Sequence, residues 1–161
     1  MKISCGIYLF RNDNKFLVGH PTGFKPHIWA IPKGRMDVGE SDHFEVAKRE
    51  LTEETCIDLT TLDIVSVKEL EIIRYRETNK YLKGFYVKVN DDFLDTDIKC
   101  ESMVMRNGKP SFPEFDEFKW VTIEESRTML HEFQHINLDR ILTINENLKF
   151  IKSFNNYDNK G

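Results

Sequence analysis

The chain lacks any apolar run long enough to cross a membrane, and it has few cysteines. A transmembrane helix needs about 18 or more consecutive apolar residues, and the 161-residue sequence contains no such run. The first residues lack a charged segment followed by a long apolar stretch, so no signal peptide is expected. Cys5, Cys56 and Cys100 are few, odd in number and far apart. They predict reduced thiols, no structural zinc and a cytoplasmic location.

The chain also lacks an excess of positive charge. Its formal net charge is −4, with 31% charged and 40% hydrophobic residues. Bulk charge therefore gives no general affinity for nucleic acid, and any such contact must come from local basic residues. We expect a single domain over residues 1–154, a polar tail over residues 155–161 and no membrane partner. The sequence does not indicate an oligomeric state.

What the chain does have is a cluster of carboxylates on one helical turn, formed by Glu50, Glu53 and Glu54. Like charges at this spacing repel each other by a few tenths of a kcal/mol per pair. On a helical wheel the three lie beside the apolar stripe made by Phe44, Ala47 and Leu51. A partly desolvated set of oxygen ligands favours Mg²⁺ or Mn²⁺. The alternative is a solvated acidic face.

The loop before this helix places cations next to the carboxylates. Lys33 and Arg35 flank Gly34, where a tight turn is expected. Cations together with metal-binding carboxylates suit a diphosphate that a metal bridges. Glu40 is a natural partner for Arg49, which would tie the loop to the helix.

These residues resemble the Nudix box, the signature of the Nudix hydrolases. Its pattern is Gly, five residues, Glu, seven residues, Arg-Glu-aliphatic, any residue, Glu-Glu, any residue, Gly, aliphatic. The chain matches it at Gly34, Glu40, Arg49–Leu51 and Glu53–Glu54. The resemblance implies a Nudix-type α/β/α sandwich with a mixed β-sheet, and a Mg²⁺-dependent hydrolase that cleaves a diphosphate bond in a nucleoside diphosphate derivative.

Two positions depart from the family pattern. Eight residues separate Glu40 from Arg49 instead of seven, and the loop is expected to absorb the extra one. Cys56 stands where the family has glycine, whose left-handed conformation would end the helix. A cysteine pays about 1 kcal/mol for that conformation, so we expect the helix to end differently.

A second acidic segment, Pro113-Glu114-Phe115-Asp116, comes just before a predicted strand and helix. Its carboxylates could reach back to a metal, and an acidic loop is an equally good interpretation from the residues alone. The segment through Trp120-Val121 is similar to one in Nudix enzymes that hydrolyse dinucleoside polyphosphates and the 5′ ends of RNA. That resemblance makes Glu114 a metal ligand, and Trp29 fits the same branch.

The resemblance implies a role for each matching residue. The expected metal ligands are four carboxylates and one main-chain carbonyl, from Glu50, Glu53, Glu54, Glu114 and Gly34. Glu53 or Glu54 would accept the proton of the attacking water. Lys33 and Arg35 would stabilise charge on the bridging and leaving phosphates.

The substrate beyond the diphosphate is predicted less sharply. A basic and aromatic cluster about the predicted hairpin could hold a base or further phosphates, and a solvated basic strand face is the alternative. Its residues are Arg74, Tyr75, Arg76, Lys80, Tyr81 and Lys83. Trp29, with Phe24 and His27, could stack on a base or pack in the core. The first candidate substrates are a dinucleoside polyphosphate or the 5′ end of RNA, bearing a triphosphate or a nucleotide cap. The alternative is a substrate of the ADP-ribose, FAD or NADH type.

One motif competes with this interpretation. His131-Glu132-Phe133-Gln134-His135 matches His-Glu-x-x-His, which binds zinc in metalloproteases when it lies on one helix. We expect one helix to end near Leu130 and another to begin near Asn137, so the histidines would share no face. A third class of protein would be a module that binds a nucleotide without cleaving it. Such a module would lack some of the carboxylates, whereas Glu50, Glu53 and Glu54 are all present here.

The remaining pattern predicts mixed secondary structure, with strands alternating with helices. The predicted strands cover residues 3–10, 15–19, 29–31, 64–76, 81–89 and 118–121, and residues 99–113 read as irregular or an edge strand. The first predicted helix begins at Ser41 or Asp42. The second runs from a capping box at Thr122 and Glu125 to about Leu130, and the third covers residues 138–151.

Overall fold

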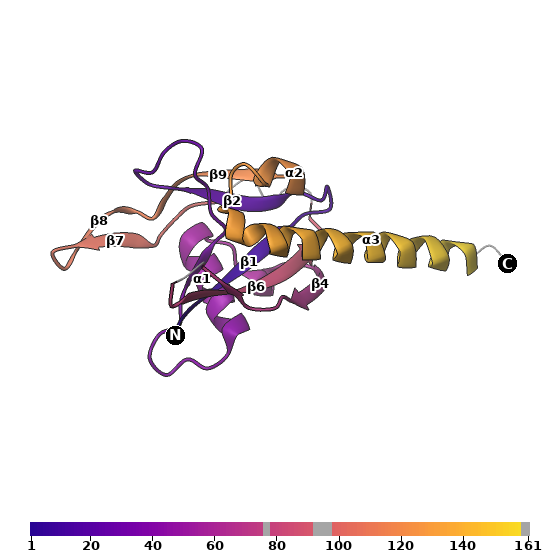
Figure 1. Ribbon diagram of the computed structural model, residues 1–161, viewed down its shortest axis with the longest axis horizontal. Coiled ribbons are helices and arrows are strands. Elements are labelled where there is room, and N and C mark those ends of the chain that lie inside the picture. Colours follow the sequence, from indigo (N-terminus) through magenta and orange to yellow (C-terminus); the bar gives the residue numbers. More distant parts are fainter. Residues whose placement is uncertain (76–77, 92–97, 159–161) are drawn as a thin grey trace.

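A mixed sheet crosses the centre of the protein, with a helix on each side (Figure 1). The computed structural model describes residues 1–75, 78–91 and 98–158. Its strands are β1 Lys2–Phe10, β2 Phe16–Pro21, β3 Lys33–Arg35, β4 Ile64–Glu69, β5 Ile73–Arg74, β6 Lys80–Val89, β7 Met103–Arg106, β8 Lys109–Pro113 and β9 Phe115–Val121. Its helices are α1 His43–Thr55, α2 Ile123–Ser126 and α3 His135–Asp158, with 3₁₀ turns η1 Leu59–Thr61 and η2 Glu132–Gln134.

The central sheet splits along β1. Its strand order is β4-β6-β1-β2-β9, with β1 and β6 parallel and the other pairs antiparallel. Ser4, Cys5 and Gly6 of β1 pair with β3, whereas Phe10 pairs with β2. Because β1 changes its neighbour along its length, β2 and β3 separate and leave a wedge between them. The site described below lies at this wedge.

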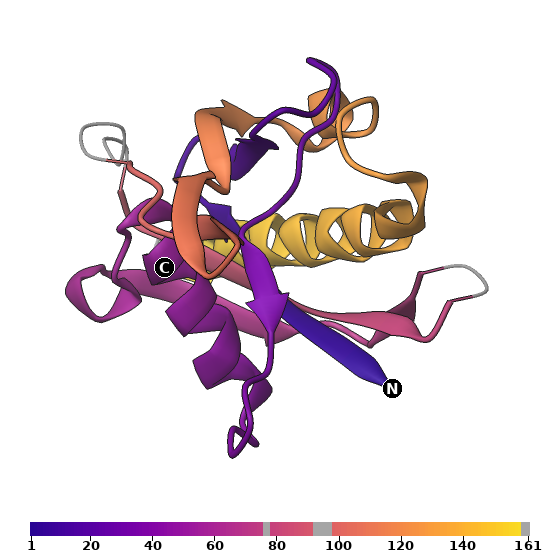
Figure 2. The same cartoon turned by 90° about the vertical axis from the view of Figure 1, so that its left-hand side faces the viewer.

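Each face of the sheet carries its own core, because side chains alternate along β1. Cys5, Ile7 and Leu9 pack with Ala47 and Leu51 of α1 on one face. Tyr8 and Phe10 pack with residues of α3, including Leu138 and Ile141, on the other. Figure 2 shows the two helices on opposite sides of the strands. This arrangement confirms the expected α/β/α sandwich with a mixed sheet.

The N-terminal end of α1 follows the predicted signal, whereas its C-terminal end does not. The Asp42 side chain caps the N-terminus by accepting hydrogen bonds from the backbone N–H groups of Phe44 and Glu45 at 2.8 and 3.1 Å. At the other end Cys56 adopts φ 59° and ψ 13°. The prediction of a different helix end was therefore wrong, because the cysteine takes the left-handed conformation that glycine would have taken.

Two predicted elements before and after this helix differ in the structure. Residues 29–31 form a single bridge between Gly19 of β2 and Ala30 instead of a strand, and Lys33–Arg35 form the strand that pairs with β1. The capping box at Thr122 and Glu125 is present, but α2 ends at Ser126, well before Leu130.

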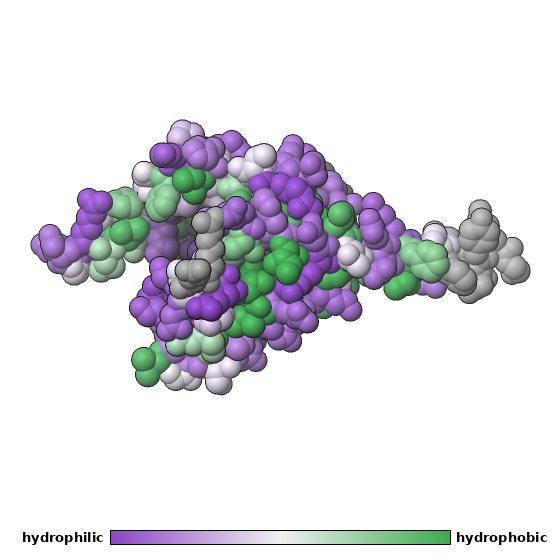
Figure 3. Space-filling view, in the orientation of Figure 1, coloured by the Kyte–Doolittle hydropathy of each residue, from purple (hydrophilic) through white to green (hydrophobic). Residues whose placement is uncertain are grey.

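Two other segments are more regular than predicted. Residues 99–113 contain the β7–β8 hairpin, which turns at Asn107 and Gly108, both with positive φ. Helix α3 is longer than predicted at both ends and includes part of the expected polar tail. The hairpin and the outer end of α3 extend from opposite sides of the body (Figure 1). Met103 and Met105 of the hairpin are exposed, and green, hydrophobic residues lie along the hairpin in Figure 3. No helix among the described residues has the length and hydropathy to span a membrane.

Candidate functional site

The glutamates of α1 point in different directions. Glu54 is 3% exposed and Glu50 is 9% exposed, so both are buried at the edge of the core. The Glu53 side chain is 47% exposed and lies on the outer side of the helix. The predicted group of three is therefore divided, with Glu50 and Glu54 facing inwards and Glu53 facing solvent.

Glu54 connects the helix to two other parts of the chain. Its carboxylate accepts a hydrogen bond from the backbone N–H of Lys33 at 2.7 Å, and it shares a hydrogen bond with Glu114. Burial, followed by this hydrogen bond, raises the pKa of Glu54 well above its usual range. Two carboxyl groups that meet in a buried place are stabilised by a proton or by a cation.

Glu50 lies directly against the backbone of β3. A β-carbon at position 34 would overlap the Glu50 carboxyl group, so only glycine allows this approach. Burial raises the pKa of Glu50 to about 6, although the neighbouring Arg49 opposes the shift. Glu50, Glu54 and Gly34 are thus brought together as the sequence predicted.

Arg49 ties the loop to the helix despite the extra residue. Its guanidinium donates hydrogen bonds to the two carboxylate oxygens of Glu40 at 2.9 and 3.1 Å and to the carbonyl of Arg35 at 3.1 Å. It also lies 3.2 Å from Glu53 and 2.9 Å from Glu50. The predicted contact between Glu40 and Arg49 is confirmed, and the inserted residue is absorbed in the loop.

A polar cavity of about 410 Å³ lies between these groups. The predicted residues on its wall are Lys33, Gly34, Arg35, Glu50 and Glu114. The wall also contains Tyr75 and Lys80 of the predicted hairpin cluster, together with Lys2 and Ser4, which the sequence reasoning did not assign to the site. No sequence pattern indicated that Lys2 and Ser4 line the cavity. Their position depends on strand pairing, which local patterns do not predict.

A second, more apolar cavity of about 340 Å³ adjoins the first. Lys33, Tyr75 and Glu114 line both cavities. Trp29, Phe24, Phe133 and Glu54 are among the other residues on its wall. The rings of Tyr75 and Phe133 have centroids 3.9 Å apart. Phe133 was missed because it occupied a variable position of the His-Glu-x-x-His motif.

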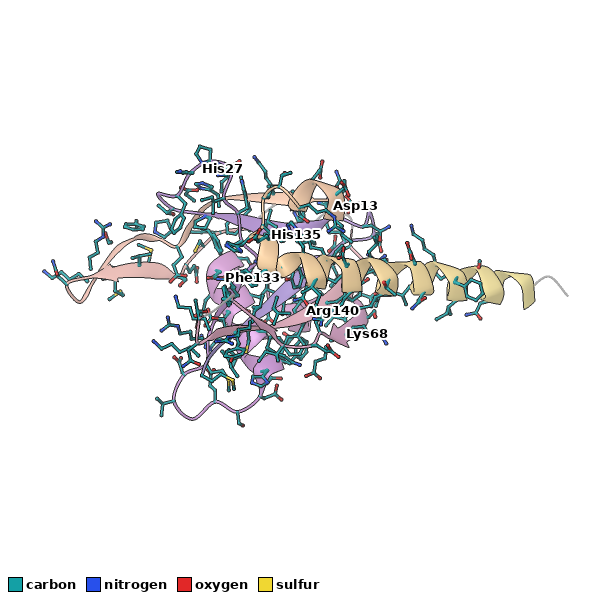
Figure 4. The ribbon with its side chains drawn as sticks, viewed as in Figure 1. Asp13, His27, Lys68, Phe133, His135 and Arg140 are labelled. Atoms are coloured by element: carbon teal, nitrogen blue, oxygen red, sulfur yellow. The ribbon has the colours of Figure 1, made fainter. Side chains whose placement is uncertain are left out.

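Other predicted substrate residues lie elsewhere. Arg74 donates a hydrogen bond to the carbonyl of Thr78 at 2.8 Å, and neither Arg74 nor Tyr81 lines these two cavities. Arg76 lies outside the described residues. His27 is exposed and lies at the outer edge of its loop, away from Phe133 (Figure 4).

The inward carboxylates fit a divalent cation in their chemistry. They offer buried oxygen donors, which Mg²⁺ and Mn²⁺ prefer. As they stand, no three histidine, cysteine, aspartate or glutamate side chains in the described parts of the chain are grouped closely enough to hold an ion. The side chains of Glu54 and Glu114 share a hydrogen bond, and the Glu50 carboxylate forms an ion pair with Arg49.

The zinc-protease motif does not form a zinc site. His131 precedes η2, and its ring accepts a hydrogen bond from the backbone N–H of Phe133. His135 begins α3, and its ring forms a hydrogen bond with the carbonyl of Arg127 at 2.9 Å. The two histidines therefore lie on either side of a bend, as expected, and share no helical face.

Fold and site together define an α/β enzyme whose helix-borne carboxylates meet a cationic cavity. A sequence model of the NUDIX domain matches residues 2–141. The RNA pyrophosphohydrolase of Pelagibacter ubique is 30% identical over 145 residues, which cover 83% of this chain and 85% of that protein. The chain belongs to the Nudix hydrolases, the enzymes that cleave diphosphate bonds.

Solved structures show the same fold. A C. elegans Ap4A hydrolase in a binary complex superposes with a TM-score of 0.65 and 23% identity, over 89% of this chain and 98% of that one. The NUDIX domain of Shewanella oneidensis NrtR, complexed with ADP ribose, gives a TM-score of 0.60 and 15% identity, over 91% and 87% of the two chains.

Proposed function

We propose that the protein is a Mg²⁺- or Mn²⁺-dependent hydrolase that cleaves a diphosphate bond in a dinucleoside polyphosphate or at the 5′ end of RNA. The observation that carries this proposal is the junction of two unlike cavities. One is polar and lined by cations and carboxylates, the other is apolar and aromatic, and they share Lys33, Tyr75 and Glu114. A nucleotide has the same two parts, a charged phosphate chain and a flat base.

Glu50, Glu54 and Glu114 would hold the cation, with the carbonyl of Gly34 as a further ligand. When bound, a divalent cation neutralises phosphate oxygens and lowers the pKa of a bound water. Lys33 and Arg35 supply positive charge to the bridging and leaving phosphates. Arg49 and Glu40 hold the loop in place, so that Arg35 stays next to α1.

The proton of the attacking water needs an acceptor, for which Glu53 and Glu54 were both candidates. Glu54 lines the apolar cavity, whereas Glu53 pairs with Arg49 on the outer side of α1. This difference favours Glu54, since Glu53 would have to leave Arg49 to reach the water. In this role Glu54, itself one of the residues that would hold the cation, would also accept the proton of the water.

The apolar cavity suits a nucleobase, which would stack on Tyr75 or Phe133 with Trp29 behind it. The names of two similar proteins, an RNA pyrophosphohydrolase and an Ap4A hydrolase, agree with this substrate class. A substrate of the ADP-ribose, FAD or NADH type is the alternative, and one structural neighbour is complexed with ADP ribose.

A substrate panel with Mg²⁺ and with Mn²⁺ tests the proposal. The panel contains diadenosine tetraphosphate, 5′-triphosphorylated and capped RNA, ADP-ribose, FAD and NADH, scored by the products formed. We expect metal-dependent turnover, with the highest kcat/KM for a polyphosphate or an RNA end. Highest kcat/KM for ADP-ribose, FAD or NADH would establish the alternative, and no turnover of any substrate would contradict the function.

Replacing Glu54 with Gln tests the site itself. Loss of the carboxylate charge should reduce kcat by about two to four orders of magnitude, the range for a lost proton acceptor. Glu45→Gln is the matched control, because Glu45 lies on the same helix and pairs with Lys48 on its exposed side. Near-normal metal-dependent rates in Glu54→Gln, with Glu45→Gln unchanged, would rule out this assignment.

A further inference from the structure

The β7–β8 hairpin lies outside both cores of the protein. Within the described parts of the chain, its two strands form a sheet of their own and pair only with each other. Its apolar side chains Met103, Val104, Met105 and Phe112 belong to neither core cluster, and both methionines are exposed. An isolated two-stranded hairpin is at best marginally stable in water. Exposed apolar groups on an element that adds nothing to the core indicate a surface for a partner.

The base of the hairpin is fixed to the rim of the candidate site. The backbone N–H groups of Glu101 and Ser102 donate hydrogen bonds to the main-chain carbonyl of Glu53 on α1, at 3.0 and 2.9 Å. On the other strand, β8 leads directly into Glu114, which lines both cavities. The hairpin therefore begins beside the carboxylates and extends away from the body (Figure 1).

One face of the hairpin combines two cations with an aromatic ring. Arg106 lies opposite Lys109 in the strand register, and opposed residues share a face of a ladder. The Arg106 guanidinium lies over the Phe112 ring, 4.9 Å from its centroid, so the ring belongs to this face too. Neither cation forms an ion pair with a carboxylate of the described residues. Residues 102–113 contain no aspartate or glutamate, so the hairpin is positive in a chain whose net charge is −4.

This face fits a single-stranded nucleic acid better than an acidic peptide. Proteins that bind single strands offer aromatic rings on which bases stack and cations that follow the phosphates. Arg106 and Lys109 repel each other, because like charges directly opposite in a ladder are destabilising. A phosphate between them would turn this repulsion into attraction. The carboxylates of an acidic peptide would do the same, but they offer no flat group to stack on the Phe112 ring.

The distance from the site limits which substrates reach these cations. Lys109 comes five residues before Glu114, and five residues of extended strand span about 16 Å. An RNA whose 5′ end lies in the cavities continues as a flexible chain of bases and phosphates, and this chain can extend along the hairpin. A nucleotide without such a chain has nothing to place on that surface.

We propose that the β7–β8 hairpin is a docking surface for single-stranded RNA whose 5′ end lies in the two cavities. One base stacks on Phe112, and Arg106 and Lys109 bind phosphates further along the chain. This inference rests on the proposed function, since it assumes that the cavities receive the 5′ end. It adds a contact that depends on the length of the RNA and not on the phosphates at its end.

Binding of RNA without a diphosphate tests the surface in the absence of turnover. Single-stranded RNAs with a 5′ monophosphate and a 3′ fluorescent label, from a dinucleotide to a decanucleotide, are titrated with the protein and Mg²⁺ and followed by fluorescence anisotropy. We expect the affinity to rise with length and to level off once the chain spans the hairpin. Affinity that does not depend on length would overturn the proposal.

The variant Arg106→Gln/Lys109→Gln removes the two cations. It should weaken the decanucleotide about tenfold and the dinucleotide less than about twofold, because only the longer chain has phosphates at the hairpin. The slope of log Kd against log salt concentration for the decanucleotide should fall by about 1.4, since each neutralised phosphate of a single strand contributes about 0.7. An equal loss for both RNAs would contradict the docking surface.

The variant Lys149→Gln/Lys152→Gln is the matched control. Both lysines are exposed on the outer half of α3, which extends from the opposite side of the body (Figure 1). It removes the same charge and should leave all affinities unchanged, whereas a loss as large as that of the hairpin variant would show a general charge effect and overturn the proposal. The Tm of both double variants should lie within about 2 °C of the wild type, as expected for surface substitutions.

Two further variants of the experiment test the stacking contact and the chemistry of the partner. Phe112→Leu keeps an apolar side chain without the ring and should weaken the decanucleotide about fivefold or more; an unchanged affinity would rule out the stacking. Polyglutamate of matched charge should not displace the decanucleotide. Equal competition by polyglutamate would assign the hairpin to acidic partners instead of RNA.

Turnover separates this inference from the proposed function. In Arg106→Gln/Lys109→Gln, the ratio of kcat/KM for a triphosphorylated decanucleotide to that for diadenosine tetraphosphate should fall about tenfold. An unchanged ratio would contradict docking of the substrate on the hairpin. If the wild type hydrolyses neither substrate, the proposed function fails, and the binding data alone still decide whether the hairpin holds RNA.

Discussion

Replacing Cys56 with glycine is expected to stabilise the protein. Cys56 closes α1 with φ 59° and ψ 13°, a left-handed conformation that costs a residue with a β-carbon about 1–2 kcal/mol. Glycine adopts it freely but loses about 0.5–1 kcal/mol more conformational entropy on folding. The difference leaves a net gain of about 0–1.5 kcal/mol. Because a protein of this size gains about 2–4 °C in Tm per kcal/mol, Tm should rise by as much as about 6 °C.

Urea unfolding and calorimetry measure this gain, and Cys56→Ala controls for the loss of the thiol. Alanine keeps the β-carbon and therefore keeps the strain. The backbone hydrogen bond from Cys56 to the carbonyl of Thr52, 2.8 Å long, remains in both variants. If alanine and glycine change the free energy of unfolding by the same amount, the strain is not the cause. If glycine destabilises the protein, the reasoning about the helix end is refuted.

Two further predictions follow from single contacts. Gly34→Ala should lower both stability and activity, because its β-carbon would overlap the Glu50 carboxyl group; the double variant Gly34→Ala/Glu50→Ala should regain the thermal stability without the activity, and no regain would show that the overlap is not responsible. His20→Gln should destabilise the protein at low pH only. The hydrogen bond between His20 and Asp116, 2.6 Å long, raises the pKa of His20, so its stabilisation is fully present below about pH 6.5 and is lost as the pH rises through the raised value. Urea unfolding at pH 5 and pH 9 measures this difference, and an equal deficit at both would contradict it.

Helix α1 could be predicted because its signals are local. Its N-cap at Asp42, its apolar stripe and its facing glutamates all follow from residues within about one or two turns of each other. The pair of Glu40 and Arg49 was also predictable, since a short loop joins them. The end at Cys56 was predicted wrongly because a cost of about 1 kcal/mol is small beside the packing of the whole helix.

The division of the glutamates could not be predicted from the helix alone. Glu53 and Glu54 are adjacent, and a helical wheel places both near the apolar stripe. What separates them is the surroundings: Glu54 meets the backbone of Lys33, and Arg49 holds Glu53 on the outer side. Likewise Tyr75 and Phe133 meet only in the folded chain, far apart in sequence, so no local pattern could pair them.

The position of the site follows from the split in the sheet. Glu50 comes from α1, which covers one face, whereas Lys33 and Arg35 point to the opposite face of the short strand β3. In a continuous sheet these charges would be separated by the sheet itself. Here β1 leaves β2 to pair with β3, and the missing side chain at Gly34 lets the Glu50 carboxyl group reach the edge of the wedge. Carboxylates from one face and cations from the other can therefore meet in one cavity, as the proposed binding of a cation and a phosphate chain requires.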